Sequence, residues 1–275
     1  MILLLVFMRT DFLKYLETLP GISLDEMSAI RLMNRTDRKY LASEEQLIKL
    51  LEMVQDDYMV QVIDDKRYAE YRTTYLDDDS YTMYIKHHNG FLRRQKVRVR
   101  EYLTTGDVFF EVKIKNNHGR TKKKRIEVDS PDSIYTNETS DFLDRYAILP
   151  IKLDELTPKI TNHFERITLV NNAKTERLTI DTGLSFSNNV SGKDLCMNNL
   201  VIIEVKRDSN TYSPILEILR KLRIHPSGCS KYCVGIALTA NGIKRNRFNI
   251  RLRNIQKIII GLSYTLYDVT IVIDI

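Results

Sequence analysis

Cysteine is scarce in this chain of 275 residues, and its distribution argues against a zinc site or a disulfide framework. Cys196, Cys229 and Cys233 form an odd set without a C-x-x-C pair. A structural zinc site needs four ligands, and Cys229 and Cys233 have no histidine at zinc-ligand spacing, although His225 is near. We therefore expect free thiols, which are the rule in a reducing cytoplasm.

Long hydrophobic runs are missing as well. The opening MILLLVFM has eight apolar residues, whereas a helix that crosses a bilayer needs about 20. It also lacks the basic region and the cleavage site of a signal peptide. The apolar stretch 258–275 is interrupted by Asp268 and Asp274 and is expected to form an edge strand or an irregular tail. We expect a soluble, cytoplasmic protein without a transmembrane segment.

Several catalytic motifs are absent. The chain has no glycine-rich phosphate loop, no G-x-S-x-G and no H-E-x-x-H, which argues against P-loop nucleotide binding, serine hydrolysis and zinc proteolysis. His87 and His88 precede Asn89-Gly90, and we expect this pair on an exposed turn. Neither internal repeats nor low-complexity segments occur.

What is present is a moderate excess of positive charge. The net charge is +6, from 42 basic and 36 acidic residues, and the pI is about 9.0. This balance favours polyanions such as phosphates or nucleic acid, although the placement of the charges says more than their sum. The hydrophobic fraction of 43% is sufficient for a large core.

Two strand-rich blocks joined by helices predict one α+β domain. Ser23 and Glu26 have the spacing of a capping box before a helix at 24–33. Residues 130–160 look helical and polar, and 230–237 form a helix or a strand. The other expected helices are 44–55, 83–88 and 212–222, and the expected strands are 35–41, 68–76, 95–102, 108–115, 122–128, 163–171, 177–182 and 200–206.

The most informative pattern is Lys96-Val97-Arg98-Val99-Arg100, in which cations alternate with valines. Successive side chains of a strand point to opposite faces, so the three cations share one face. Like charges that face each other in a sheet repel, and a bound oligophosphate supplies the compensating anion. By strand phase, the candidates for one shared interior are Lys39, Lys96, Arg98, Arg100, Lys113, Arg166, Arg177, Lys206 and Lys231.

Carboxylates occur in the same phase. Asp37 is in phase with Lys39, and Glu111 with Lys113, so local ion pairing explains these two as well as any function does. Glu204 differs because its strand is otherwise apolar. A single carboxylate beside phosphate is typical of bound Mg²⁺ or Mn²⁺, which predicts Glu204 as a metal ligand.

Taken together, these segments resemble the VTC domain, the polyphosphate-polymerase module first described in the vacuolar transporter chaperone complex of yeast. That domain belongs to the triphosphate tunnel metalloenzymes, which include the CYTH proteins. The resemblance covers roughly residues 30–240 in order and approximate spacing. The matching segments are Arg35-Thr-Asp37-Arg-Lys39-Tyr40, Lys96 to Tyr102, Glu111-Val-Lys113, Phe164-Glu-Arg166, Arg177 to Thr182, Val201 to Lys206 and Ser230-Lys231-Tyr232.

The resemblance implies an antiparallel eight-stranded β-barrel with flanking helices, whose tunnel is lined by Lys and Arg. It implies catalytic roles for Arg98, Arg100, Lys113, Arg166 and Arg177, with Arg98 and Arg100 gripping nucleotide phosphates. Glu204 is implied as the ligand of Mn²⁺ or Mg²⁺. Phosphate binding is predicted for Lys39, Lys96, Lys123, Lys206 and Lys231, where Lys123 belongs to the ambiguous run Lys122-Lys123-Lys124-Arg125.

Two differences from the wider superfamily narrow the range of functions and domain arrangements that we expect. The signature E-x-E-x-K is replaced by Arg35, Asp37 and Lys39, which disfavours a thiamine triphosphatase or an adenylyl cyclase. The transmembrane and SPX regions of the eukaryotic complex are missing, so we expect a stand-alone domain. The predicted divisions are a helical segment at 1–30, the tunnel domain at 31–245 and a tail of uncertain structure at 246–275.

Three functions remain open. The first is an ATP-dependent polyphosphate polymerase, with ATP and inorganic polyphosphate as partners and no nucleic acid. The second is an inorganic tripolyphosphatase or nucleoside triphosphatase in the same tunnel. The third is a non-catalytic module that binds polyphosphate or nucleic acid. The sequence does not separate the first two, because they differ only in whether a phosphate chain or water accepts the phosphoryl group.

Overall fold

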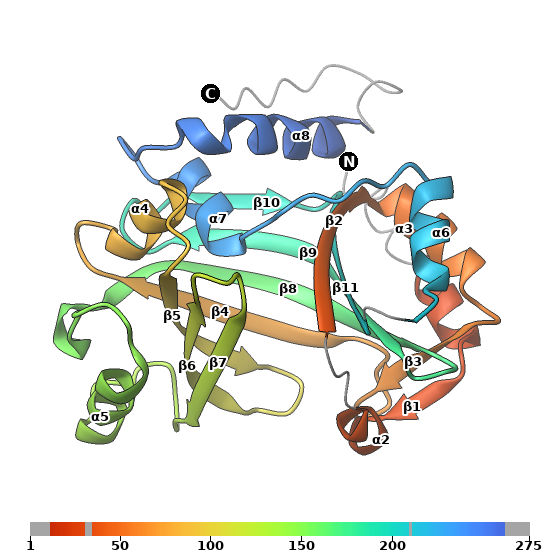
Figure 1. Cartoon of the computed structure of the whole chain (residues 1–275), viewed down its shortest axis with the longest axis horizontal. Helices are drawn as coiled ribbons and strands as arrows, with labels where there is room; N and C mark the ends of the chain where they lie inside the picture. Colours follow the sequence, from red (N-terminus) through yellow and green to blue (C-terminus); the bar gives the residue numbers. More distant parts are fainter. Residues whose placement is uncertain (1–11, 31–34, 209–210, 262–275) are drawn as a thin grey trace.

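The computed structural model describes residues 12–30, 35–208 and 211–261, which form one curled sheet with helices around it (Figure 1). A helical segment at 12–18 precedes the first strand. The helices are α2 (Leu24–Ala29), α3 (Glu44–Met53), α4 (Thr82–His88), α5 (Asn137–Tyr146), α6 (Pro214–Lys221), α7 (Lys231–Thr239) and α8 (Asn249–Ile260), with short 3₁₀ turns at Leu153–Glu155 and Asn246–Phe248.

The strands are β1 (Gly21–Ser23), β2 (Arg35–Ser43), β3 (Tyr58–Val62), β4 (Ala69–Asp77), β5 (Arg94–Tyr102), β6 (Val108–Lys115), β7 (Thr121–Glu127), β8 (Thr157–Asn171), β9 (Glu176–Asn188), β10 (Asp194–Met197) and β11 (Leu200–Asp208). Eight of them form an antiparallel path in the order β2-β11-β9-β8-β4-β5-β6-β7. β10 and β3 pair with β9 and β8, and β1 adds to β3 in parallel.

The path curls so that its two ends stand on the same side of β8 and β9. In Figure 1, β2 and β11 lie on one side of the view and β5 to β7 on the other, in front of the long strands β8 and β9. Among the described strands, no ladder joins β2 to β7. The predicted α+β tunnel fold with eight antiparallel strands is thus confirmed, and its wall is not closed by backbone pairing.

The curled sheet has two arms, which are β2 with β11 at one end of the path and β5 to β7 at the other. A loop before α7 contacts both arms. The backbone N–H of Ser227 donates to the carbonyl of Lys39 on β2 at 2.8 Å, and Pro226 forms a bridge with Tyr40. Three residues later, the Ser230 hydroxyl accepts a hydrogen bond from Lys96 Nζ on β5 at 2.6 Å. This loop therefore connects strands that do not pair with each other.

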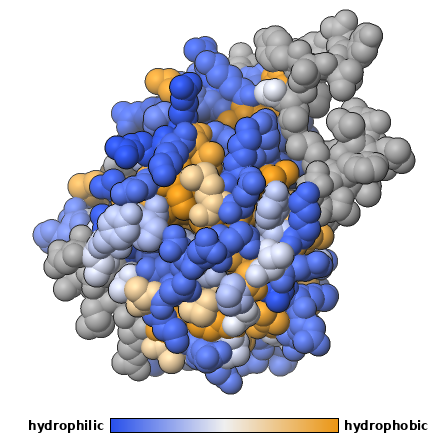
Figure 2. Space-filling view, turned by 90° about the vertical axis from the view of Figure 1, so that its right-hand side faces the viewer, coloured by the Kyte–Doolittle hydropathy of each residue, from blue (hydrophilic) through white to orange (hydrophobic). Residues whose placement is uncertain are grey.

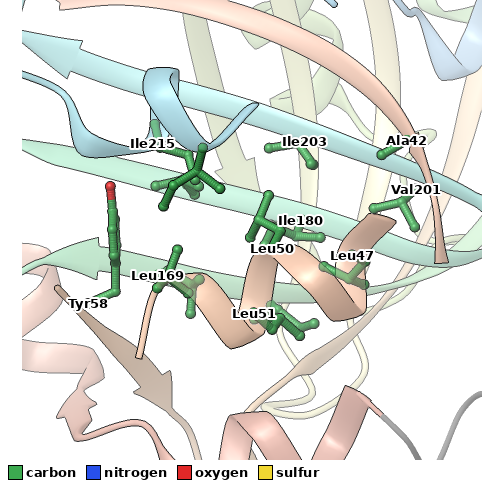
Figure 3. Packing of buried hydrophobic residues seen from close by; sticks show 14 of the residues in the cluster. Ala42, Leu47, Leu50, Leu51, Tyr58, Leu169, Ile180, Val201, Ile203 and Ile215 are labelled. Atoms are coloured by element: carbon green, nitrogen blue, oxygen red, sulfur yellow. The ribbon is translucent and has the colours of Figure 1, made fainter. Parts of the chain in front are cut away.

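The convex face of one arm packs against α3 and α6 (Figure 3). Ser43 caps α3 in a reciprocal capping box with Gln46, and Leu47, Leu50 and Leu51 point from the helix to the sheet. Full burial of each leucine contributes about 1.5–3 kcal/mol to folding. The surface on this side of the molecule is mostly hydrophilic, with hydrophobic residues between the polar ones (Figure 2).

A second core lies under α5, and a third lies on the concave side under α7. Val97, Val99 and Phe110 fill the convex face of β5 and β6 against α5. Helix α7 is buried almost all round and packs against β8 and β9. Gly235 permits this close approach, because a Cβ there would lie 2.4 Å from Ile160 Cδ1 and 2.6 Å from Phe186 Cδ1.

The strands predicted from alternation are present, with several corrections at their ends. The helical assignment of 130–160 was wrong for 157–160, which belong to β8, and β9 runs on past Thr182 to Asn188. Residues 231–237 lie in α7, which Ser230 caps, and α2 ends at Ala29, while 31–33 lie outside the described residues. Residues 258–260 end helix α8 and do not form a strand; the rest of that predicted tail, apart from Gly261, is not described.

No helix among the described residues combines the length and the apolar character needed to span a membrane.

The predicted position of the pair His87-His88 on an exposed turn was wrong. His88 is buried, with 2% of its surface exposed, and its Nε2 accepts the backbone N–H of Arg247. The turn signal Asn89-Gly90 was correct, but the helix before it packs inward against α7 and Phe248.

Candidate functional site

Strand register places the predicted tunnel residues on one face of the sheet. Residues directly opposite each other in antiparallel strands point the same way, and the pairs Lys39↔Glu204, Lys206↔Arg177 and Arg98↔Glu111 are examples. Followed along the whole path, the same concave face carries Lys39, Lys96, Arg98, Arg100, Lys113, Lys123, Arg166, Arg177, Glu204 and Lys206. Lys231 joins them from the first residue of α7.

Glu111 is a buried carboxylate that two cations hold. Arg98 binds its Oε2 through Nε at 2.7 Å and Nη2 at 2.5 Å, and Lys123 binds its Oε1 at 3.0 Å. Burial alone would raise the pKa of Glu111, but Arg98, Arg100 and Lys123 outweigh burial and lower the pKa to about 2. Glu111 therefore stays charged and fixes the Arg98 guanidinium. Local ion pairing, one of the two sequence-based explanations for Glu111, is present.

Asp181 forms a second anchor that sequence reasoning did not assign to the site. Arg166 binds it in bidentate fashion, Nε to Oδ1 at 2.6 Å and Nη2 to Oδ2 at 2.9 Å, and Lys231 also binds Oδ2. Burial opposes the charge, but Arg166 and Lys231 hold the pKa of Asp181 well below its usual range. One sequence pattern indicates this position, because Asp181 alternates with Arg177 and Thr179 and therefore lies on the same face of the strand.

Glu204 is the third carboxylate. Lys39 Nζ lies 2.8 Å from its Oε1 and Lys206 Nζ lies 3.1 Å from its Oε2. Although burial raises the pKa of Glu204, Lys206 and Lys39 lower it far below its ordinary value. It remains an ionised oxygen donor on the concave face.

The donor set fits a metal that takes most of its ligands from phosphate. In the part of the chain that the structure describes, no group of three or more His, Cys, Asp or Glu side chains converges on one point. A cage made only by protein is therefore absent there. Mg²⁺ and Mn²⁺ accept one or two carboxylates together with phosphate and water oxygens, and Glu204 supplies such a carboxylate.

Three further cations on this face form no ion pair with a described carboxylate. Among the described residues, no ion pair involves Lys96, Arg100 or Lys113. Part of the Lys113 side chain is exposed to solvent, and the desolvation of its ammonium group between the two arms, together with Arg98 and Lys96, lowers its pKa to about 7. Glu204 and Lys39, on the opposite arm of the sheet, also act on Lys113. The two arms thus face each other across a cationic interior.

Aromatic rings complete the lining, and sequence reasoning missed them. Phe164 stacks on Tyr71 with ring centroids 5.2 Å apart. The Lys231 ammonium lies 3.1 Å from the Phe164 centroid, and Arg100 lies within 6 Å of both rings. Cation–π contacts of this kind hold cations in place without neutralising them, so the charge stays available for an anion.

Arg177 is the predicted residue that lies apart from these clusters. Its Nη2 donates to the carbonyls of Met27 at 2.6 Å and Ile30 at 3.4 Å, at the C-terminal end of α2. The guanidinium therefore complements a helix terminus, whose unpaired carbonyls carry partial negative charge. Its catalytic role stays a prediction.

The family model for the VTC domain matches residues 34–240, which include every residue placed on the concave face. This chain belongs to the VTC domain family. Family membership indicates an enzyme that handles polyphosphate or triphosphates. No curated protein matches the sequence significantly.

Solved structures of other proteins are similar to this VTC domain protein at low sequence identity. A protein from Hippeastrum, described as having a dominant triphosphatase activity, is 15% identical with a TM-score of 0.45, and the match covers 74% of this chain and 94% of that chain. A conserved hypothetical protein from Pyrococcus furiosus is 12% identical with a TM-score of 0.36, over 70% and 97% of the two chains.

Proposed function

We propose that this protein is a polyphosphate polymerase that transfers the γ-phosphoryl group of ATP to the end of a growing polyphosphate chain and releases ADP. The observation that carries the proposal is the concave face itself. Glu111, Asp181 and Glu204 are each bound by two cations, while Lys96, Arg100 and Lys113 have no carboxylate partner among the described residues. Such a face lacks the anion that a phosphate chain supplies.

The chemistry requires alignment and charge neutralisation more than covalent work. The new bond joins an oxygen of the terminal polyphosphate to the γ-phosphorus, and the bond from that phosphorus to the β-phosphate oxygen of ATP breaks. An ionised phosphate acceptor carries no proton that a base must remove. Arg100 and Lys113 would neutralise the charge that builds on the leaving ADP, and Arg98 is preorganised for this by Glu111.

Glu204 is the residue that would hold Mn²⁺ or Mg²⁺, and the ion would supply neutralisation of phosphate oxygens. In the structure Lys39 and Lys206 occupy both of its oxygens. Those two lysines would then turn to phosphate, which gives them the phosphate-binding role that the sequence predicts for them. Lys231 would do the same beside Asp181.

Product analysis tests this function directly. Purified protein is incubated with ATP and Mn²⁺, and the products are separated by size. We expect a ladder of polyphosphate together with ADP. Orthophosphate without polymer would instead identify a triphosphatase. Steeply salt-dependent binding without turnover would identify a binding module.

A Glu204→Gln variant tests the role of the carboxylate. Glutamine has nearly the same shape but cannot neutralise two ammonium groups or act as an anionic metal ligand. We expect turnover to fall by about 100-fold, as when one preorganised polar group is removed from an active site. Glu52→Gln, an exposed change of the same type on α3, is the control. Unchanged turnover in Glu204→Gln would contradict the proposed site.

A further inference from the structure

The cationic face continues past the predicted tunnel residues to the end of the β5–β6 ladder. Three successive pairs stand opposite each other on this face: Arg98↔Glu111, Lys96↔Lys113 and Arg94↔Lys115. Only the first is an ion pair. The next two bring like charges face to face, which is destabilising unless an anion lies between or beside them.

Helix α8 adds a further cation at this end of the molecule, where α4, α7 and α8 gather (Figure 1). The Arg251 side chain lies against the loop before α7, since a Cβ built on Gly228 would be 3.6 Å from Arg251 Nη2. It also lies over the ring of Phe248, 5.7 Å from the centroid. α8 carries three cations and no acidic residue, and it follows the family match that ends at residue 240.

The same loop lies between α8 and this end of the β5–β6 ladder. Ser230 accepts a hydrogen bond from Lys96, and two residues before it Gly228 lies beside Arg251. The loop thus brings α8 to the ladder end of β5 and β6. We refer to Arg94, Lys115 and Arg251 as the mouth cations.

The surroundings of His87 indicate that the mouth cations lie near one another. Its Nδ1 lies 3.0 Å from Cys233 Sγ, on the inner side of α4. Burial lowers the pKa of His87 to about 2, and Lys96, Arg94, Arg251 and Lys115 add to the effect in that order. His87 is therefore neutral, and four cations from three separate elements act on the same ring.

The mouth cations have no acidic ion-pair partner among the described residues. Within the described residues, none of the ion pairs involves Arg94, Lys115 or Arg251. The hydrogen bond from Arg94 Nη1 goes to the backbone carbonyl of Phe91 at 2.7 Å, which leaves its charge uncompensated. The mouth cations are half-buried, so part of each remains open to a ligand.

We propose that the mouth cations bind the phosphates of a polyphosphate chain where it leaves the tunnel, and that they make the protein prefer long chains to tripolyphosphate. The choice of polyphosphate rests on the proposed function. The physical reason is that Arg94 and Lys115 extend the row of Arg98, Lys96 and Lys113 along the same face, and Arg251 adds a cation beside them from α8. A short triphosphate that is held at the centre of the row does not reach them.

The test compares two triple variants with equal loss of charge. The first is Arg94→Gln, Lys115→Gln, Arg251→Gln. The control is Lys122→Gln, Lys124→Gln, Arg253→Gln, at exposed positions on β7 and α8. Lys122 and Lys124 stand opposite Ile114 and Val112 and so point away from the concave face. Circular dichroism and thermal unfolding establish that both variants fold.

Binding of long-chain polyphosphate and of tripolyphosphate is measured by titration at several salt concentrations. For the mouth variant we expect about tenfold weaker binding of the long chain and a salt slope smaller by about two, since each phosphate contact contributes about 0.7 to the slope for a single strand. Tripolyphosphate affinity should stay within about twofold of the wild type, and the control variant should resemble the wild type.

Three results would overturn the inference: unchanged long-chain binding, equal weakening for both ligands, or single-stranded nucleic acid binding the mouth as tightly as polyphosphate does. The proposed function fails separately. If the wild type makes no polymer but long-chain binding still depends on the mouth cations, the inference stands without the polymerase. If the wild type makes polymer and the mouth variant binds normally, the inference alone is wrong.

Discussion

Lysine and arginine behave differently on the concave face. Burial lowers the pKa of both Lys113 and Lys231 to about 7. Arg98 and Lys96 lower the pKa of Lys113 further. For Lys231, the Asp181 carboxylate raises the pKa and Arg166 lowers it. Arg98 and Arg166 stay charged throughout the working range, because their partners raise their pKa further. Lys113 therefore gains full charge only when an anion arrives, whereas Lys231 already lies against the Asp181 carboxylate.

This difference predicts how binding depends on pH. A bound phosphate raises the pKa of Lys113, so binding requires a proton that the free protein loses as the pH rises above 7. The affinity for tripolyphosphate should fall as the pH rises from 7 to 9, by at most about tenfold per unit from this lysine. Well below pH 7 Lys113 is already protonated and contributes no slope.

The Lys113→Arg variant provides the comparison, because its guanidinium stays charged. It should show a shallower loss of affinity between pH 7 and 9 in calorimetric titrations. Ionisation of the ligand is common to both proteins and cancels in the comparison. Identical slopes for the wild type and the variant would mean that Lys113 does not take up a proton on binding.

For single residues, the sequence predicted which basic side chains share the concave face better than it predicted the side chains that contact them. Alternation identified Arg98, Lys113 and Lys206 because a repeated charge in one strand phase is visible without any knowledge of neighbours. Asp181 and Phe164 are single residues whose role depends on which strands become adjacent. The contact of Arg177 with α2 also needed the tertiary structure, since 150 residues separate Arg177 from Met27.

At the scale of elements, α7 depends on the absence of one side chain. Gly235→Ala would place a methyl group against Ile160 and Phe186, at 2.4 Å and 2.6 Å from their nearest atoms. Alanine favours the helix by about 1 kcal/mol, but overpacking costs about 1–3 kcal/mol. We expect a net loss of stability and a weaker hold on Lys231, measured by urea unfolding.

Ile160→Val removes the Cδ1 atom that stands closest to this position, and alone it should cost about 0.5–1.5 kcal/mol. The double variant should then be less destabilised than the sum of the two single variants. Strict additivity would show that the clash is relieved elsewhere.

Element ends were the least predictable part of the fold. Pro158 belongs to the stretch 130–160 that was expected to be helical, yet it lies in β8, opposite Leu76 where the register with β4 shifts. Gly183, which has a positive φ of 59°, lies within β9 opposite the irregularity between His163 and Glu165. Bulges accommodate Pro and Gly within strands, so residues that normally end a strand did not do so here.

For the whole molecule, the two arms of the sheet are joined by a loop and repel through their charges. The loop from Pro226 to Ser230 is the link between β2 and β5, and Lys113 on one arm faces Lys39 on the other. The eight-stranded path was predictable from strand count and family resemblance. The missing ladder between β2 and β7 was not, because pairing at sheet edges depends on how strongly the whole sheet curls.

A ligand that neutralises this interior should stabilise the entire fold. Tripolyphosphate at about 100 times its Kd should contribute about 2.7 kcal/mol. That corresponds to a rise in Tm of roughly 5–10 °C for a domain of this size. Differential scanning fluorimetry measures the shift, with sodium chloride at matched ionic strength as the control. Arg100→Gln should reduce the shift, because Arg100 has no carboxylate partner among the described residues. An equal rise in Tm with chloride would mean general screening of charge, not bound phosphate between the arms.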